Sequence, residues 1–469
     1  MLRAELRQLF RLALPLAAAQ AGTQLMTVVD VAVLGRYSAR DLAAVGFANA
    51  FFFGITVIGM GAVFGIDPLV SQAVGAGDPL RARRSLWQGV WFALSVTAVL
   101  TLPLLACAVL MQHVGVAPEL IGPGREYLLI RTAGLAPLLL FLVIRSYLQA
   151  HSITKPMLMA MVIANIVNFF GDLLLVFGAG PIPALGAAGA AISTVAASLL
   201  EVAIVAWAAR NVDVTSFRAP QSARNLGGED AHLPDSSPAS RLGMTTRAWD
   251  TAEIRRMFRM GWPVAMQLAA EVGIFALVGV LAARLGTTQL AGHQVVLSLA
   301  SFTYTMSLGI AAAGSVRVGI AIGSRRLEAT RVAGRAAFIG GGAIMSIGAL
   351  LFALAPRQLA RLVTDQESVI LAAIPLFSIA ALFQISDGLQ AVGSGVLRGA
   401  GDTHFSFVAN LIGHWAIGAP VAWYLGFHRG MGIVGLWWGL CAGLTAVAVM
   451  LIYRYERLTM APIEPVIDR

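Results

Sequence analysis

Runs of about twenty apolar residues recur along this chain and constrain its fold more than any other feature. An apolar helix of roughly 20 residues can cross a hydrocarbon core about 30 Å thick. Because lipid offers no hydrogen-bond partners, such runs cross it as helices. The sequence therefore predicts an all-α integral membrane protein with twelve transmembrane helices. The predicted spans are 9–34, 42–66, 86–112, 126–150, 157–179, 186–210, 257–283, 290–322, 336–355, 369–397, 405–426 and 432–453.

Composition supports this class, since 58% of the 469 residues are hydrophobic and only 12% are charged. Soluble domains carry about a quarter charged residues. The N-terminal "MLRAELRQLFRLALPLAAAQAG" could be read as a cleaved signal peptide, but its apolar run continues to Leu34, far past a signal-peptide core. We therefore interpret it as the first membrane span.

The distribution of basic residues predicts the orientation in the membrane. An even number of spans places both termini on one side, and most of the 33 Lys and Arg residues fall on that side. Cytoplasmic loops carry such an excess of positive charge. We expect a multi-pass protein of the cell inner membrane with both termini cytoplasmic. We therefore interpret the net charge of +9 as a reflection of this orientation and of contact with anionic headgroups of the lipid bilayer, and not as a sign of nucleic-acid binding.

A polar segment containing "LPDSSPAS" divides the twelve spans into two groups of six. We predict an N-terminal six-helix lobe at 1–210, a cytoplasmic linker at 211–252, and a C-terminal six-helix lobe with a short cytoplasmic tail at 253–469. An offset of 248 residues aligns Pro15 with Pro263 and Gly75 with Gly323. Each half has an even number of spans, so the lobes form a parallel internal repeat.

The paired prolines are hinge candidates. Pro15 and Pro263 lie inside the first and seventh spans, where proline removes a helical hydrogen bond and favours a bend. The alternative is a static kink that neighbouring helices tolerate.

Several kinds of chemistry are excluded by motif. Lys155 is the only lysine and stands in "ITKP", so there is no phosphate-binding loop and no nucleotide site. The common zinc and serine-hydrolase motifs are absent, and Cys107 and Cys441 lie in apolar spans. We expect neither a cofactor nor a resident metal, and no enzymatic activity.

One enzymatic interpretation remains as a remote alternative. "GAGD" occurs at 75–78 and 399–402 and resembles the signature of intramembrane aspartyl proteases, which also need a Tyr-Asp pair that this chain lacks. Both copies fall at span exits, where Gly-rich turns are expected anyway.

Ionisable residues within the spans are the main candidates for function, because burying a charge near the bilayer centre costs at least about 2.5–3.5 kcal/mol. Asp30 lies in the first span, and Asn165, Asn168 and Asp172 follow an i, i+3, i+7 pattern on one face of the fifth. We expect Asp30 and Asp172 to lie at a similar depth in the first lobe.

The second half carries a corresponding acidic pair, Glu271 in the seventh span and Asp387 in the tenth. Each acid could instead be a carboxyl hydrogen-bonded between helices without a role in transport. Glu201, His293 and His414 are weaker candidates and are expected to form interhelical hydrogen bonds. Buried carboxyls can exchange protons, and carboxylates beside an amide oxygen can hold Na⁺. The residues alone leave both ions open.

The order and duplication of short motifs resemble multidrug and toxic compound extrusion (MATE) transporters. The resemblance rests on "VVDVAVLG" in the first span, "PLVSQAVGAGD" after the second, "LAAEVGIF" in the seventh and "LRGAGDT" after the tenth. It implies two six-helix lobes around a V-shaped cleft, and export of small organic, often cationic, substrates driven by H⁺ or Na⁺.

The resemblance also implies site residues. NorM-type members are similar at Asp30, Glu271 and Asp387, and DinF-type members at Asp30, Asn168 and Asp172, where protonation is thought to bend the first span near a proline like Pro15. Both sets are present here, so the coupling ion and the lobe that binds it stay open. The main alternative is a lipid-linked oligosaccharide flippase of the same superfamily, which would need a basic cleft.

Overall fold

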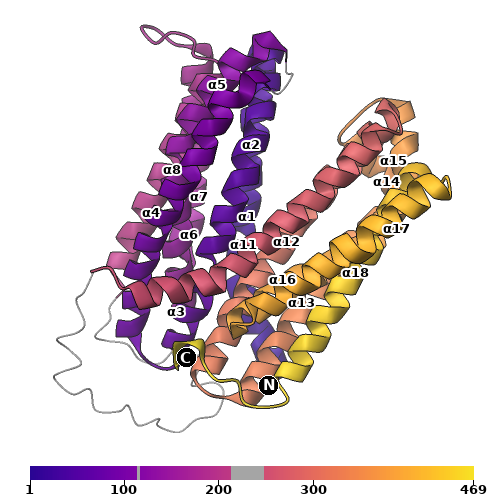
Figure 1. Cartoon of the computed structure of the whole chain (residues 1–469). Helices are drawn as coiled ribbons and strands as arrows, with labels where there is room; N and C mark the ends of the chain where they lie inside the picture. Colours follow the sequence, from indigo (N-terminus) through magenta and orange to yellow (C-terminus); the bar gives the residue numbers. More distant parts are fainter. Residues whose placement is uncertain (114–116, 213–247, 469) are drawn as a thin grey trace. The chain divides into compact units, whose positions relative to one another are not determined.

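The computed structural model of the chain describes residues 1–113, 117–212 and 248–468, which form helices with short turns and one isolated β-bridge between Ala179 and Ile182 (Figure 1). In the first half the helices are α1 (Leu2–Tyr37), α2 (Ala39–Val63), α3 (Ile66–Gly75), α4 (Pro79–Leu110), η1 (Met111–His113), α5 (Pro118–Ala133), α6 (Leu135–Ala150), α7 (Lys155–Phe177) and α8 (Ala187–Arg210). In the second half they are α11 (Thr251–Ala283), α12 (Thr287–Gly323), α13 (Leu327–Leu354), α14 (Pro356–Arg361), α15 (Glu367–Ala400), α16 (Thr403–Leu411), η3 (Ile412–Gly418), α17 (Ala419–Trp423), η4 (Tyr424–His428), α18 (Gly432–Leu458) and η5 (Val466–Asp468).

Within the described ranges, 12 helical spans are long and apolar enough to cross a membrane, which confirms the all-α, twelve-span prediction. Four of them combine several helices. The second joins α2 and α3, the third joins α4 and η1, the fourth joins α5 and α6, and the eleventh runs from α16 to η4. The eleventh contains the π-helical segments η3 and η4, a geometry that often marks functional sites.

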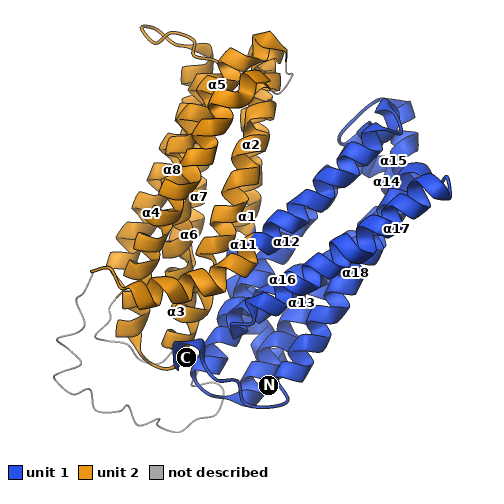
Figure 2. Ribbon diagram, viewed as in Figure 1, with its two compact units in different colours: residues 1–17, 219–229, 266–469 blue, residues 18–218, 230–265 orange. Residues whose placement is uncertain are grey.

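Contacts divide the described chain into two compact units whose boundaries fall inside helices (Figure 2). Unit 1 contains residues 1–17 and 266–468, and unit 2 contains 18–212 and 248–265. The first turns of α1 thus pack with the second half of the chain, and the first turns of α11 pack with the first half. The lobes at 1–210 and 253–469 stay a prediction, and most of the predicted linker, 213–247, lies outside the described residues.

In unit 1, α1 is held by a close backbone approach and a buried ion pair. A Cβ added at Gly309 of α12 would lie 2.6 Å from the backbone nitrogen of Ala17, so only glycine fits there. Nearer the N-terminus, both carboxylate oxygens of Glu5 accept hydrogen bonds from the Arg317 guanidinium, at 2.5 and 2.6 Å. This pair is almost fully buried, and its two-point geometry compensates for the lost hydration of each charge.

In unit 2, α11 is held in the equivalent way. A Cβ at Gly61 of α2 would lie 2.4 Å from the Cα of Ala265, and these positions correspond to Gly309 and Ala17 by the 248-residue offset. Ser85 donates a hydrogen bond of 3.1 Å to Glu253. Residues 1–17, which begin α1, thus belong to unit 1, and residues 251–265, which begin α11, belong to unit 2. We call these two segments the exchanged helix ends. Each stops two residues after a proline, Pro15 or Pro263.

Aromatic side chains form much of the unit 1 core. Phe352 and Phe377 meet edge to face at 5.1 Å between ring centroids, and Phe383 meets Trp437 at 5.4 Å. His293 is fully buried against Trp437, and neither ring nitrogen has a hydrogen-bond partner within the described part of the chain. Its expected interhelical hydrogen bond is therefore absent there, and His293 packs as a core ring.

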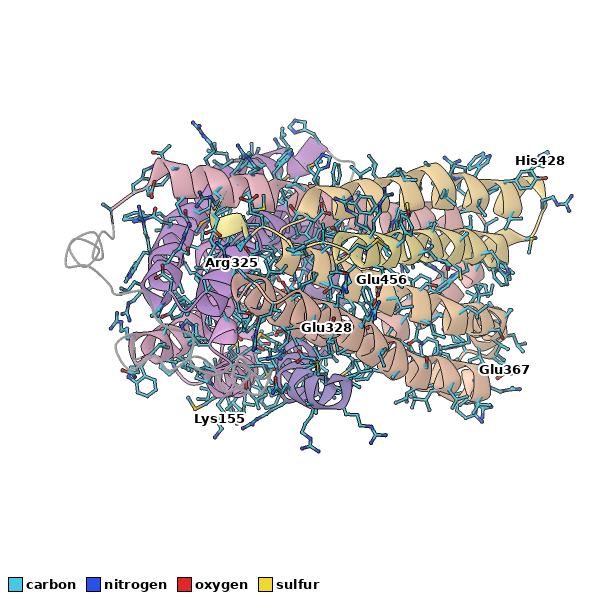
Figure 3. The ribbon with its side chains drawn as sticks, turned by 90° about the horizontal axis from the view of Figure 1, so that it is seen from below. Lys155, Arg325, Glu328, Glu367, His428 and Glu456 are labelled. Atoms are coloured by element: carbon cyan, nitrogen blue, oxygen red, sulfur yellow. The ribbon has the colours of Figure 1, made fainter. Side chains whose placement is uncertain are left out.

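Ion pairs on the surface of unit 1 connect different helical segments, and Figure 3 labels one member of each pair, Arg325, Glu367 and Glu456. Arg335 binds Glu456 at 2.6 Å, Arg325 binds Asp468 at 2.9 Å, and Arg357 pairs with Glu367. Exposed pairs of this kind contribute only about 0–1 kcal/mol each. They orient loops and the C-terminal tail more than they stabilise the fold.

The two "GAGD" segments form helix-connecting turns. Asp78 caps α4 by accepting a hydrogen bond from the Arg81 amide at 2.9 Å, and Asp402 binds Arg454 at 2.7 Å. Both aspartates have structural partners, as expected of turns and not of a catalytic pair.

Candidate functional site

Unit 2 contains a buried polar cluster built from three helices. Asn168 and Asp172 lie one turn apart on α7 and are fully buried. Asp30 of α1 lies beside both of them, and its charge and that of Asp172 act on each other. Thr194 of α8 donates a long hydrogen bond of 3.4 Å to Asp30. We call Asp30, Asn168, Asp172 and Thr194 the first cluster.

Most polar atoms of the first cluster have no partner. Both carboxylate oxygens of Asp172, Oδ1 of Asp30, and the amide oxygen and nitrogen of Asn168 form no hydrogen bond of normal geometry to a described group, although Asp30 lies next to Asp172 and Asn168, and Ser193 lies next to Asp172. An unpaired buried polar group costs roughly 1–3 kcal/mol, and an unpaired charge costs more. The arrangement is therefore suited to a ligand that supplies positive charge or protons to oxygen atoms.

Arg131 of α5 is a cation near this cluster that sequence reasoning did not single out. Its charge acts on Asp30, and its guanidinium lies over the Phe52 ring, 4.4 Å from the centroid. This cation offsets part of the negative charge of Asp30.

Unit 1 contains a second cluster, in which the acid has partners. Glu271 of α11 accepts hydrogen bonds from the Tyr304 hydroxyl at 3.3 Å and from the Gln390 amide at 3.2 Å. The same amide nitrogen of Gln390 donates to Asn410 at 3.0 Å. Asp387 lies one turn before Gln390 on α15, close enough for the charge of Glu271 to act on it. These five residues form the second cluster.

Further polar contacts extend the second cluster along α11, α15 and α16. Gln267 donates to Ser394 at 2.9 Å, and Ser406 lies 3.2 Å from the same hydroxyl. Asn410 also donates to the Ser406 carbonyl at 2.9 Å. A connected set of donors orients the Glu271 carboxylate, in contrast with the unpartnered oxygens of the first cluster.

The remaining candidates lie outside these contacts. Asn165 donates to the carbonyl of Met161 in its own helix at 2.9 Å. His414 uses Nδ1 for the carbonyl of Asn410, 3.1 Å away in the same span, while its Nε2 has no partner among the described groups. Glu201 of α8 lies within reach of the charge of Arg145.

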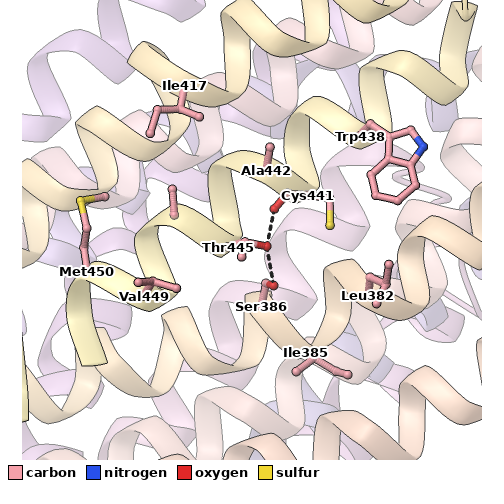
Figure 4. Close-up of a pocket in the computed structure, with 11 residues that line it drawn as sticks. Leu382, Ile385, Ser386, Ile417, Trp438, Cys441, Ala442, Thr445, Val449 and Met450 are labelled. Atoms are coloured by element: carbon pink, nitrogen blue, oxygen red, sulfur yellow. Dashed lines mark hydrogen bonds between the residues drawn. The ribbon is translucent and has the colours of Figure 1, made fainter. Parts of the chain in front are cut away.

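A groove of about 820 Å³ lies elsewhere in unit 1, between α15 and α18 (Figure 4). Its walls are apolar, apart from a chain in which Ser386 contacts Thr445 at 2.8 Å and Thr445 donates to the Cys441 carbonyl. No carboxyl or basic group lines it. The groove therefore lacks the charge needed to bind a coupling cation.

Sequence reasoning missed the uncharged partners, chiefly Tyr304, Gln390 and Asn410. A signal for one of them was present, because Gln390 follows Asp387 by three residues and so shares its helix face. Tyr304 lies 33 residues from Glu271 on another helix, and no local spacing connects them.

Comparison with known proteins places the chain in a family. The sequence model of the family described as MatE matches residues 15–174 and 263–424, more than half of the chain. A probable multidrug resistance protein NorM of Rhizobium meliloti is 32% identical over 455 residues, covering 95% of this chain and 92% of the relative. Its namesake in Deinococcus radiodurans is 33% identical over 471 residues, covering 98% and 96%.

Solved structures agree on the fold. The eukaryotic MATE transporter AtDTX14 matches with a TM-score of 0.83 and 20% sequence identity, covering 98% of both chains. At that identity the likeness shows the fold alone, whereas the family match and the relatives cover nearly the whole sequence. The chain belongs to the MatE family.

Proposed function

We propose that this protein is a secondary active multidrug efflux transporter that exports small organic, often cationic, compounds in exchange for H⁺ or Na⁺. Its relatives at 32–33% identity are named multidrug resistance protein NorM, and they align along almost the whole chain. MatE proteins are multi-pass membrane transporters and not enzymes, and they use ion gradients without an organic cofactor.

The proposed setting is the cell inner membrane with both termini cytoplasmic, as the basic residues indicate. The lobes 1–210 and 253–469 would alternate in access to the two sides, connected by the cytoplasmic linker 211–252. A bound ion drives such a change only through different affinities for the two arrangements.

The first cluster carries the ion-binding part of the proposal. Five buried polar atoms of Asp30, Asn168 and Asp172 lack partners among the described groups, and carboxylate and amide oxygens are suitable ligands for a proton or a hard cation. Binding one cation there would offset the uncompensated charge and favour the arrangement in which the site is closed.

The second cluster carries the proposed substrate contact. Hydrogen bonds from Tyr304 and Gln390 hold the Glu271 carboxyl in place, and Asp387 adds a second carboxyl nearby. A pair of carboxyls attracts an organic cation, and an ion bound to the same acids would compete with it. The flippase alternative would require basic groups, whereas the two donors to Glu271 are a neutral hydroxyl and a neutral amide.

The test is efflux of ethidium from proteoliposomes, with a proton gradient and a sodium gradient imposed separately. We compare wild type, Asp172→Asn, Glu271→Gln and the intramembrane control Glu201→Gln, which lies outside both clusters. Coupling free energies of 1–3 kcal/mol predict a loss of about 5- to 150-fold in gradient-driven efflux for Asp172→Asn. Glu271→Gln should instead raise the ethidium concentration needed for half-maximal efflux.

Two results would overturn the proposal. Efflux that is equally fast in Asp172→Asn would exclude the first cluster as the coupling site. Vesicles that move a lipid-linked pyrophosphate but no organic cation would assign the protein to the flippase class.

A further inference from the structure

A segment of eleven residues is repeated at the starts of α1 and α11. "ELRQLFRLALP" at 5–15 and "EIRRMFRMGWP" at 253–263 align by the same offset of 248 residues. Glutamate, two arginines four residues apart, phenylalanine and proline occupy equivalent positions in both. The copies lie in different compact units, and each lies in an exchanged helix end.

In each copy, one helix face is buried. Glu5 is 3% exposed and Leu9 is fully buried in unit 1, and their equivalents Glu253 and Met257 are 8% and 0% exposed in unit 2. Glu5 binds Arg317, while Glu253 binds Ser85 and Arg256. The buried face therefore anchors each helix end to its unit.

The opposite face carries exposed arginines. Arg7 and Arg11 of α1 are exposed, and Arg3 extends the row by one more turn. Their equivalents on α11, Arg255 and Arg259, are also exposed. Residues four apart lie above one another on a helix, so each copy presents a stripe of guanidinium groups. Within the described residues none of the five takes part in an ion pair.

Apolar side chains follow each stripe by one turn. Leu14 is 57% exposed, and its equivalent Trp262 is 48% exposed and stacks on Phe258 with 5.9 Å between ring centroids. Exposed aromatic rings beside basic residues are typical of the membrane interface. Along each helix the arginines come first and the apolar side chains follow. A lipid has the same order from the membrane surface inward, with the headgroup first and the acyl chain after it.

Helix length is sufficient to bring the stripes to that level. α1 has 36 residues and α11 has 33, so they measure roughly 54 and 50 Å, whereas the hydrocarbon core is about 30 Å thick. Each helix is therefore long enough for its first turns to lie in the headgroup layer, and arginine side chains can extend further toward it.

We propose that the two stripes, Arg3/Arg7/Arg11 and Arg255/Arg259, are docking surfaces for the phosphate of an anionic phospholipid. The guanidinium fork binds phosphate through two parallel hydrogen bonds, and the adjacent Leu14 or Trp262 meets the upper acyl chain. Because the opposite face is anchored to its unit, the lipid contacts the segments that end at Pro15 and Pro263. This surface does not depend on what the protein transports.

The experiment measures lipid selectivity directly. The full-length protein is reconstituted in phosphatidylcholine vesicles, and electron spin resonance reports the motionally restricted fraction of spin-labelled phosphatidylglycerol and of spin-labelled phosphatidylcholine. The variants are Arg7→Gln/Arg11→Gln and Arg255→Gln/Arg259→Gln. The matched control is Lys155→Gln/Arg210→Gln, which removes the same charge from exposed residues at other helix ends; Lys155 is labelled in Figure 3.

A basic residue near an anionic surface strengthens binding by about fivefold, so each stripe variant should lose several-fold selectivity for phosphatidylglycerol while the control loses little. An unchanged phosphatidylcholine fraction and circular dichroism spectrum show that the variant is folded. Selectivity that survives both stripe variants would overturn the proposal. An equal loss in the control would also overturn it, because diffuse positive charge would then explain the preference.

Discussion

At the scale of single residues, hydrogen-bond partners distinguish the two acidic clusters. Glu271 has two donors that hold its carboxylate, whereas Asp172 has none among the described groups. A carboxylate with fixed donors is held in one orientation. One without donors gains most from a cation or a proton, so the two clusters are suited to different tasks.

A residue outside the membrane offers a clean electrostatic test. Asp250 precedes α11, where its carboxylate accepts hydrogen bonds from the amides of Ala252 and Glu253 and pairs with Arg84 at 2.6 Å. Burial raises the pKa of Asp250, but these hydrogen bonds and the Arg84 charge outweigh it and lower the pKa below its ordinary 3.8. The interactions of the charged carboxylate therefore stabilise the folded state fully at pH values above the ordinary pKa of 3.8.

We expect Asp250→Asn, which keeps a capping oxygen but removes the charge, to lower stability by about 0.3–1 kcal/mol at neutral pH. The difference from wild type should disappear as pH falls through the lowered folded pKa, since the carboxyl is then neutral in both states. Thermal unfolding in detergent across pH measures it, with Asp365→Asn, in the loop before α15, as control. A difference that persists undiminished in acid would show that the charge is not the cause.

Sequence reasoning found the intramembrane acids because a charge stands out against apolar neighbours. It did not find Gln390 or Asn410, whose amides disturb the hydropathy pattern far less. Arg131 lies within the predicted span 126–150 but was not singled out, since its closeness to Asp30 depends on how α5 packs. A charged residue can be recognised from the sequence of its own helix, whereas the residues that contact it lie on other helices.

At the scale of elements, two glycines allow the exchanged helix ends to pack. The backbones of α2 and α11 meet at Gly61, and those of α12 and α1 meet at Gly309. Without a hydrophobic driving force between helices in lipid, such close contacts supply much of the packing energy. They explain why the first turns of α1 and α11 stay with units formed by the other half of the sequence.

Gly61→Ala should destabilise unit 2, because the new Cβ would lie 2.4 Å from the Cα of Ala265 and neither backbone can yield easily. Overpacking of this kind costs typically 1–3 kcal/mol. A Cβ added at Gly54 on the same helix would meet no atom within 4 Å, so Gly54→Ala should be neutral or gain up to about 1 kcal/mol of helix propensity. Thermal unfolding of both variants in detergent tests this, and equal stabilities would contradict the close approach.

At the scale of the whole molecule, hydropathy predicted the twelve spans because it reports burial in lipid, which every span shares. It could not predict that α1 and α11 each divide between two units, since most packing partners inside a membrane are apolar and hydropathy does not distinguish among them. The 248-residue offset was visible in Pro15 and Pro263, and it extends to Gly61 and Gly309. The repeat thus applies to contacts between helices as well as to the helices themselves.

We expect relative motion of the two units to bend α1 and α11, because both helices run from one unit into the other. The boundaries follow residues 17 and 265, two positions after Pro15 and Pro263, where a backbone hydrogen bond is already missing. Pro15→Ala and Pro263→Ala restore that bond, so we expect each to stiffen its helix and slow efflux several-fold.

Pro103 of α4 and Pro375 of α15 provide the control, since they also lie inside helices but far from a unit boundary. Pro103→Ala and Pro375→Ala remove the same ring without changing a segment that connects the units. Ethidium efflux from proteoliposomes, normalised to inserted protein, compares the four variants. If all four slowed transport alike, the loss would reflect general helix stiffness, and bending at the exchanged ends would not be the moving step.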